Sequence, residues 1–190
     1  MELKDLVMHN RSYRRFDSNV IIDRELIIEW LDSARCTASA RNLQSLRYAV
    51  AADKATNEKI FGELKWAGYL PDWTPSATEQ PAAYVVFCND KNLAAATPQI
   101  DLGIQAQTLL LSAVESGFGG CILLAFNKVN VAEILQLPSH LDPVLVVALG
   151  CPAEHCEIAP VKEDGDIRYY RDAESNHYVP KRSLKELIVG

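Results

Sequence analysis

Apolar residues along the chain follow two periods, and these predict alternating helices and strands. Helical spacing of apolar residues behind Asp23, a suitable N-cap, predicts a helix over 24–35. Short apolar runs bounded by turn residues predict strands at 47–52, 83–88, 121–126 and 143–150. Further helices are predicted at 5–8, from a capping Asp53 to about residue 64, over 98–116 behind Thr97, and from a capping Asn127 to about residue 137.

The helix over 98–116 is apolar almost all round and stops at Gly117. We therefore expect it to be the buried central helix. The chain after Gly150 is polar and has few core-forming runs. A tail of this composition cannot bury itself, so residues 150–190 are expected to lie along the domain or along a partner subunit.

Residues 65–82 read as a long loop that contains three prolines, Trp66, Tyr69 and Trp73. Long loops with aromatic residues are often functional. The three aromatic side chains are candidates to line a substrate pocket. They could equally anchor the loop to the core, and the sequence leaves both interpretations open.

Composition limits the class of protein. The chain has 190 residues, of which 48% are hydrophobic, so we expect a single domain over 1–190 with a sizeable core. A net charge of -6 argues against binding to nucleic acid or an anionic membrane. No apolar run approaches the roughly 18 residues of a membrane span, and residues 1–10 lack the apolar core of a signal peptide. A cytoplasmic protein is expected.

Several familiar chemical signatures are missing. The sequence has no phosphate-binding P-loop, no nucleophile elbow and no pair of metal-binding histidines on a helix. The glycines of 117–120 follow a helix and precede a strand, the reverse of the order in dinucleotide-binding proteins. Cys151, His155 and Cys156 lack a second ligand pair, so no metal site is expected.

Three basic or polar patches remain, at residues 10–16, 39–47 and 179–187. Each could be a solvated surface when taken singly. Together, in an acidic chain, they indicate a small anionic ligand. Arginine and serine suit phosphate oxygens, while asparagine and glutamine suit the edge of a heterocycle.

The order of these patches resembles the nitroreductase family of flavin enzymes. The stretch NRSYRRF at 10–16 is similar to the family's R-R-S-x-R-x-F pattern, and ASARNLQSL is similar to its P-S-A-x-N-x-Q-P-W motif. The stretches GFGGC, ALGCPAE and HYVPKRSLKEL resemble its later segments. Asn10 stands where the family has an arginine, and Ser45-Leu46 stand where it has Pro-Trp, which puts one cofactor contact and the path of that loop in doubt.

The resemblance implies that the ligand is flavin mononucleotide (FMN). It implies cofactor contacts from Arg11, Ser12, Arg14, Ser39, Arg41, Asn42, Gln44, Gly119, Gly120, Lys181 and Arg182. Arg11, Ser12 and Arg14 would approach the phosphate from one side, and Lys181 and Arg182 from the other. Asn42 and Gln44 would hydrogen-bond the ribityl chain or the ring edge, and the two glycines would leave room for the ring. Arg15 is expected to point elsewhere, because side chains alternate in an extended segment.

The resemblance also implies an α+β fold: a central mixed sheet flanked by helices, in a homodimer whose tails reach over the partner. The implied activity is a ping-pong oxidoreductase that takes hydride from NADH or NADPH and reduces a small acceptor such as a nitroaromatic or quinone. The cofactor carries the chemistry, so we nominate no catalytic side chain. Two alternatives stay open: a dehalogenating or flavin-fragmenting enzyme of the same fold, and a flavin-binding storage or regulatory protein with little turnover.

Overall fold

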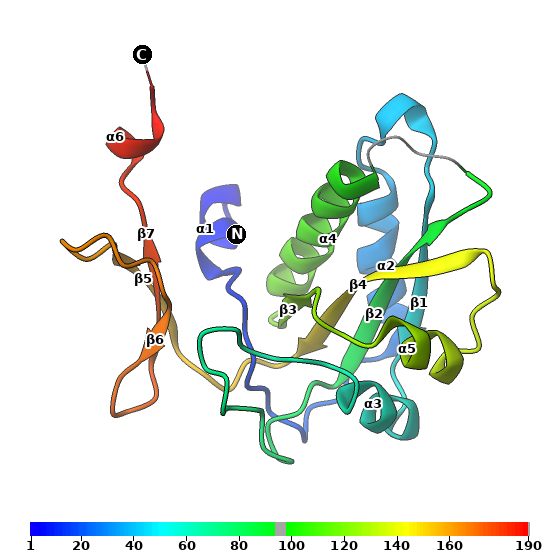
Figure 1. Ribbon diagram of the computed structural model, residues 1–190, viewed down its shortest axis with the longest axis horizontal. Coiled ribbons are helices and arrows are strands. Elements are labelled where there is room, and N and C mark those ends of the chain that lie inside the picture. Colours follow the sequence, from blue (N-terminus) through cyan, green and yellow to red (C-terminus); the bar gives the residue numbers. More distant parts are fainter. Residues whose placement is uncertain (94–97, 190) are drawn as a thin grey trace.

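The computed structural model describes residues 1–93 and 98–189 (Figure 1). Its centre is a four-stranded sheet in the order β1-β2-β4-β3, in which neighbours pair antiparallel. The strands are β1 (Leu46–Ala51), β2 (Ala83–Asp90), β3 (Gly119–Leu123) and β4 (Leu141–Gly150). A bridge from Ser12 to Gly120 adds a parallel neighbour at the β3 edge. The predicted α+β class is confirmed.

Helices cover both faces of this sheet (Figure 1). One face carries α2 (Arg24–Arg35) and α4 (Pro98–Glu115), and the other carries α3 (Lys54–Phe61) and α5 (Lys128–Ile134). Alternate residues of a strand point to opposite faces. Val85 and Phe87 of β2 therefore join the first core, while Tyr84 and Val86 join the second.

The capping predictions held at two of three sites in the described residues. Oδ1 of Asp53 accepts from the backbone N–H of Thr56 at 2.9 Å, and Oδ1 of Asn127 accepts from Asn130 at 3.2 Å. Asp23 is the N-cap residue of α2, but its side chain makes no capping hydrogen bond. Thr97, the predicted cap of α4, lies outside the described residues.

The observed bounds of two elements differ from the predicted ones. The strand predicted over 121–126 begins two residues earlier and ends at Leu123, because Gly119 and Gly120 pair with β4. The helix after Asn127 ends at Ile134. The central helix α4 packs one side against α2 and the sheet, but it leaves Ile100 and Ile104 exposed.

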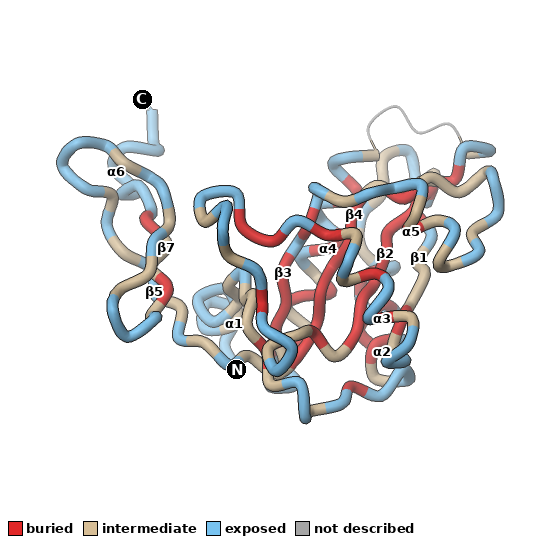
Figure 2. Tube along the Cα trace, turned by 60° about the horizontal axis from the view of Figure 1, so that its bottom comes forward, coloured by how far each residue is buried: buried red, intermediate tan, exposed pale blue. Residues whose placement is uncertain are grey.

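The tail forms a small sheet of its own (Figure 1). Its elements are β5 (Cys156–Pro160), β6 (Tyr170–Arg171), β7 (His177–Lys181) and a short α6 (Leu184–Leu187). The order is β5-β7-β6, with β5 and β7 parallel. Figure 2 shows burial concentrated in the central strands, whereas the described residues of the tail are exposed or half-buried apart from His177 and Pro180. Among the described helices, none is long and apolar enough to cross a bilayer.

Candidate functional site

The N-terminal arginine segment runs along the open edge of β3. The bridge between Ser12 and Gly120 places it there, and α1 (Leu3–His9) directly precedes the segment in the chain. Arg11 donates through Nη2 to the carbonyl of Val7 at 2.8 Å. Its Nε is buried and has no hydrogen-bond partner in the described residues. The side chain of Arg11 therefore keeps a donor that a ligand could use.

Arg14 turns toward the aromatic loop. Its Nε donates to the carbonyl of Trp66 at 2.9 Å and its Nη1 to that of Ser12 at 3.2 Å, while the guanidinium lies 4.9 Å from the ring centre of Tyr169. Arg15 forms an ion pair with Glu79 instead. The two neighbouring arginines thus have separate partners, as an extended segment requires.

A buried carboxylate fixes the path of this segment. Glu154, whose side chain is 1% exposed, accepts from the backbone N–H groups of Arg14 and Arg15 at 2.5 and 3.1 Å. Its other oxygen pairs with Arg171 at 3.0 Å. Removing one partner of such a buried ion pair strongly destabilises the folded protein, because the other charge is left buried and unpaired. Glu154 therefore joins the segment, the end of β4 and the tail.

The three aromatic residues predicted for a substrate pocket lie in different surroundings. Trp66 is buried and packs on Phe61 with ring centres 5.4 Å apart. Tyr69 is exposed and contacts Tyr169 at 4.9 Å between ring centres. The Arg171 guanidinium lies 4.1 Å from the ring centre of Trp73. The loop is thus anchored to both the core and the tail, and only Tyr69 presents much of its ring to solvent.

His177 is the most unusual group of the tail. It is 1% exposed, and both ring nitrogens lack a hydrogen-bond partner within the part of the chain that the structure describes. Burial, together with the charges of Arg14 and Arg171, lowers the pKa of His177 to about 4. The imidazole is therefore neutral at pH 7, and it packs in a tilted arrangement on Tyr169 with 5.2 Å between ring centres.

Unpaired buried donors gather in these neighbouring segments. Arg11 Nε, Trp66 Nε1 and Arg171 Nε have no acceptor among the described residues. Unpaired buried polar groups are costly, so such a set calls for acceptor atoms from a ligand or water. The donors are guanidinium and indole N–H groups, which suits a phosphate or the carbonyl edge of a flavin ring.

The paired glycines of β3 are closely surrounded by this chain's own atoms. A methyl group added at Gly119 would lie 2.6 Å from the ring of Tyr13 and 2.9 Å from Pro152. One added at Gly120 would collide with the carbonyl of Ala148. Packing within the chain therefore already requires glycine at both positions. Their predicted contact with the flavin stays a prediction.

The second polar patch is built on a buried acid that the sequence did not single out. Asp101 of α4, 2% exposed, accepts from Ser39 Oγ at 2.6 Å and from the backbone N–H of Ala40 at 3.0 Å. The chain then passes through three residues with positive φ, at Arg41, Asn42 and Gln44. Positive φ is uncommon outside glycine and clusters at functional sites. The side chains of these three residues are exposed.

One chain does not bring the three patches together. Ser39 contacts Asp101 in the first turn of α4, whereas Gly120, which is bridged to Ser12, lies beside Leu110 in the second half of that helix. The helical rise from residue 101 to residue 110 separates the two patches by about 14 Å along α4. Lys181 and Arg182 are exposed at the end of β7, where Arg182 lies 3.9 Å from Glu186. Figure 1 shows this end of the tail outside the layers of the central sheet.

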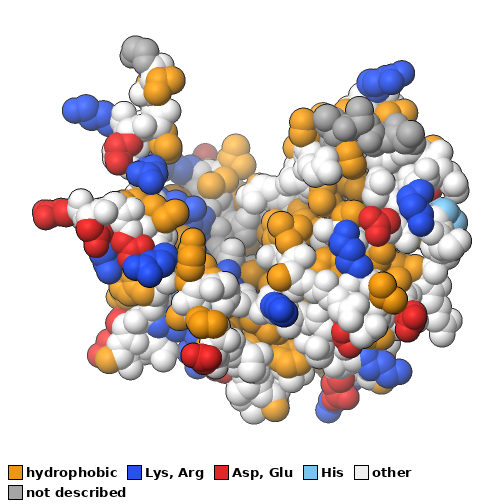
Figure 3. Space-filling model, in the orientation of Figure 1, with side chains coloured by type: hydrophobic (Ala, Val, Ile, Leu, Met, Phe, Trp, Pro, Cys, Tyr) orange, Lys and Arg blue, Asp and Glu red, His pale blue; other side chains and the backbone are white. Residues whose placement is uncertain are grey.

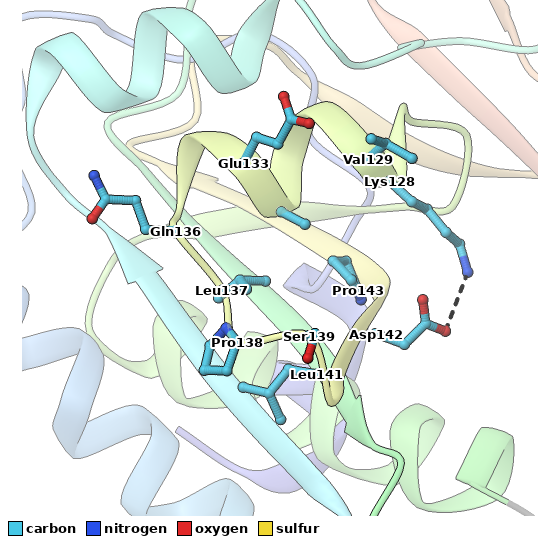
Figure 4. Close-up of a pocket in the computed structure, with 11 residues that line it drawn as sticks. Lys128, Val129, Glu133, Gln136, Leu137, Pro138, Ser139, Leu141, Asp142 and Pro143 are labelled. Atoms are coloured by element: carbon cyan, nitrogen blue, oxygen red, sulfur yellow. Dashed lines mark ion pairs between the residues drawn. The ribbon is translucent and has the colours of Figure 1, made fainter.

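A shallow pocket of about 350 Å³ lies elsewhere, between α5 and the start of β4 (Figure 4). Lys128 and Asp142 at its mouth pair with each other at 3.8 Å. Apolar atoms of Leu137, Leu141 and Pro143 form much of its wall. Because its charged groups at the mouth pair with each other, this pocket is a weaker candidate than the N-terminal site.

The fold and the site define an α+β protein with a donor-rich binding site at the edge of its sheet. The family model described as Nitroreductase family matches residues 7–151. The chain is 30% identical over 174 residues to the oxygen-insensitive NADPH nitroreductase of Salmonella typhimurium, a match that covers 82% of this chain and 68% of that protein. The chain belongs to the nitroreductase family.

Solved structures agree on the fold. A nitroreductase family protein from Clostridium novyi NT matches with a TM-score of 0.67 and 20% identity, over 100% of both chains. An FMN-dependent nitroreductase from Clostridium difficile R20291 matches with a TM-score of 0.67 and 19% identity, over 82% of this chain and 90% of that one. The predicted cofactor, FMN, and the predicted class, an NAD(P)H oxidoreductase of the nitroreductase type, are confirmed with the family.

Proposed function

We propose that the protein catalyses ping-pong electron transfer from NADH or NADPH to a small acceptor such as a nitroaromatic or a quinone. The observation that supports this most is the donor-rich site at the β3 edge. It combines unpaired N–H groups of Arg11, Trp66 and Arg171. An acceptor-rich, anionic cofactor with a flat ring satisfies such a set, and FMN is one.

In this proposal Arg11, Ser12 and Arg14 hold the cofactor's phosphate or pyrimidine edge, and Lys181 and Arg182 add charge from the tail. Ser39, Arg41, Asn42 and Gln44 form the second wall of the site, with Gly119 and Gly120 beside it. Bound FMN supplies the hydride chemistry, accepting electrons from the nicotinamide and passing them to the acceptor. The chain's side chains bind and orient, and none is assigned as acid or base.

Tyr69 is the residue that we assign to the substrate. It is 49% exposed, while its ring rests on Tyr169 and its backbone N–H donates to the Tyr169 hydroxyl at 3.1 Å. A ring held in this way can stack on a flat acceptor at little entropic cost. In this proposal Trp66 and Trp73 do not contact the substrate. They anchor the loop to the rest of the chain.

We further propose a homodimer in which each site takes residues 10–16 from one subunit and residues 39–44 from the other. The separation of about 14 Å along α4 between the two patches of one chain supports this arrangement. Figure 3 shows the surface hollowed between the tail and the body, where a second body could lie under the tail. Large exposed apolar side chains that such an interface could cover include Val7, Met8, Ile100, Ile104, Ile122, Leu124, Leu184 and Leu187.

A single preparation tests the activity. Protein loaded with FMN is given NADH or NADPH together with a quinone, and oxidation of the nicotinamide is followed at steady state. Many turnovers per flavin are expected. Oxidation that stops after one turnover would favour a storage protein instead. We place the protein in the cytoplasm, where reduced nicotinamide nucleotides are regenerated.

A further inference from the structure

The side chain of Asp101 connects the two ends of the loop over residues 39–44. Asp101 lies in the first turn of α4 and is 2% exposed. At the start of the loop its two oxygens accept from the Ser39 hydroxyl at 2.6 Å and from the backbone N–H of Ala40 at 3.0 Å. At the end of the loop the backbone N–H of Gln44 donates to the same Ser39 oxygen at 3.0 Å. One buried carboxylate thus closes the loop through one hydroxyl group.

The Ser39 hydroxyl is occupied by this connection. A hydroxyl carries one proton, and here the proton goes to Asp101, because a carboxylate can only accept and the backbone N–H of Gln44 can only donate. While the connection holds, Ser39 has no proton to donate to a cofactor. Its contribution to the proposed site is therefore the position of the loop, whose side chains at residues 41, 42 and 44 are exposed.

The backbone of this loop needs such support. Arg41, Asn42 and Gln44 have φ angles of 54°, 54° and 49°. Positive φ is unfavourable for residues other than glycine, and it persists only where the surroundings enforce it. Asp101 enforces it with a buried charge that takes part in no ion pair among the described residues. A buried charge without a cation costs folding free energy, so its use here points to the loop geometry that it maintains.

We propose that Asp101 is a positioning residue for FMN. Acting through Ser39, it holds residues 39–44 in their binding shape before the cofactor arrives, so that Asn42 and Gln44 are already presented to it. This inference rests on the proposed function, in which these residues form one wall of the FMN site. A loop that is already in its bound shape loses less conformational entropy on binding, which raises affinity. Asp101 itself contacts no atom of the cofactor.

The test compares variants of the full-length protein by two measurements: FMN affinity by titration, and hydrogen exchange of the backbone amides of Ala40 and Gln44 before FMN is added. Asp101→Asn keeps the shape of the side chain but replaces one acceptor oxygen by a donor. Both amides should exchange at least about fivefold faster, and FMN should bind at least about tenfold more weakly. Glu115→Gln removes a carboxylate from the exposed end of the same helix and should change neither quantity.

Two substitutions of Ser39 test the connection without altering the buried acid. Ser39→Ala should speed exchange at Gln44, leave the Ala40 amide protected by Asp101, and weaken FMN binding at least about fivefold. Ser39→Thr keeps the hydroxyl on an extended backbone, with φ of -129° and ψ of 139°, that threonine readily adopts. It should restore both quantities to within about twofold of the parent's values.

Failure of this inference can be told apart from failure of the proposed function. Unchanged exchange at Gln44 in Ser39→Ala, or a Ser39→Thr variant no better than Ser39→Ala, overturns the positioning role and leaves the proposed FMN site standing. Faster exchange with unchanged FMN affinity overturns the inference and also means that residues 39–44 do not meet the cofactor. If Asp101→Asn does not fold, the two Ser39 variants decide the question by themselves.

Discussion

Two adjacent arginines give the sharpest contrast at the scale of single residues. Arg14 reaches the carbonyl of Trp66 and lies over Tyr169 in the donor-rich site, whereas Arg15 is held by Glu79 on the other side of the segment. Charge-assisted hydrogen bonds contribute roughly 1.5–3 kcal/mol each. We therefore expect Arg14→Ala to weaken FMN binding on the order of ten- to a hundredfold.

Arg15→Ala is the matched control, since it removes the same side chain from the next position. It should leave FMN affinity nearly unchanged. Titration of flavin-free protein with FMN, followed by quenching of flavin fluorescence, measures both variants. Equal affinity of Arg14→Ala and the parent would mean that the segment does not hold the cofactor.

His177 makes stability depend on pH. Burial lowers its pKa from 6.5 to about 4, helped by Arg14 and Arg171, so the unfolded chain binds a proton more readily than the folded chain. The contribution to stability is present above pH 6.5 and is lost as the pH falls toward 4. The loss should reach roughly 3 kcal/mol, at about 1.4 kcal/mol for each pH unit in this window.

His177→Phe keeps a ring beside Tyr169 but cannot take up a proton. Urea unfolding of the parent and of this variant at pH 7 and pH 4 separates the histidine from the carboxylates, which titrate in both proteins. The free energy of unfolding should fall less in the variant between the two pH values. Parallel losses would mean that His177 is already charged or solvated in the folded chain.

The candidate residues that could be predicted from the sequence are those that form a recognisable motif of consecutive positions. Arg11, Ser12 and Arg14 stand in a recognisable segment, and the structure brings that segment to the glycines of β3. Glu154 and Asp101 were missed as anchors, since each acts through backbone N–H groups that are distant in sequence. No local pattern reports such a contact. The positive φ values at Arg41, Asn42 and Gln44 were equally invisible, because these residues usually adopt negative φ.

At the scale of elements, the strongly periodic segments were predictable and the tail was not. Strands buried on both faces, such as β2 and β4, read as continuous apolar runs. The strands β5, β6 and β7 are short and half-exposed, and β5 pairs in parallel with a partner some twenty residues away. Their order depends on the ion pair of Glu154 with Arg171 and on the stack around Tyr169.

The separate tail sheet leads to a prediction about truncation. Ending the chain before Val179 removes most of β7, the central strand of the tail sheet, together with Lys181 and Arg182. The central sheet has its own two cores and should stay folded, while FMN binding should fall at least about tenfold as two phosphate-suited cations are lost. Circular dichroism and flavin content after gel filtration measure the two effects.

The double variant Lys181→Ala/Arg182→Ala distinguishes charge from structure. It leaves β7 in place and should reproduce most of the loss in FMN affinity. Lys185→Ala, on the exposed helix α6, is the control for removal of a tail cation. If truncation empties the site but the double variant does not, the tail serves to cover the site and its cations do not bind the phosphate.

At the scale of the whole molecule, the distance between residues 10–16 and residues 39–44 of one chain bears on whether a complete site needs two subunits. If residues 10–16 come from one subunit and residues 39–44 from the other, a defect in either patch disables a different half of each site. Arg14→Glu and Asn42→Ala should each have low activity alone. In a mixed dimer of the two variants, one site carries both defects and the other carries none.

Co-expression of Arg14→Glu and Asn42→Ala should therefore restore activity. Random assembly makes half of the dimers mixed, and half of the sites in these are intact, so about a quarter of the parent's activity per flavin site is expected. The mixed dimer can also be purified by selecting for two different tags, one on each variant. Its rate of steady-state quinone reduction should be about half that of the parent, because half of its sites are intact. If each site were instead built from a single chain, every site of the mixed dimer would carry one of the two defects. Activity no higher than the average of the two single variants would thus overturn the shared site and, with it, the reason for the homodimer.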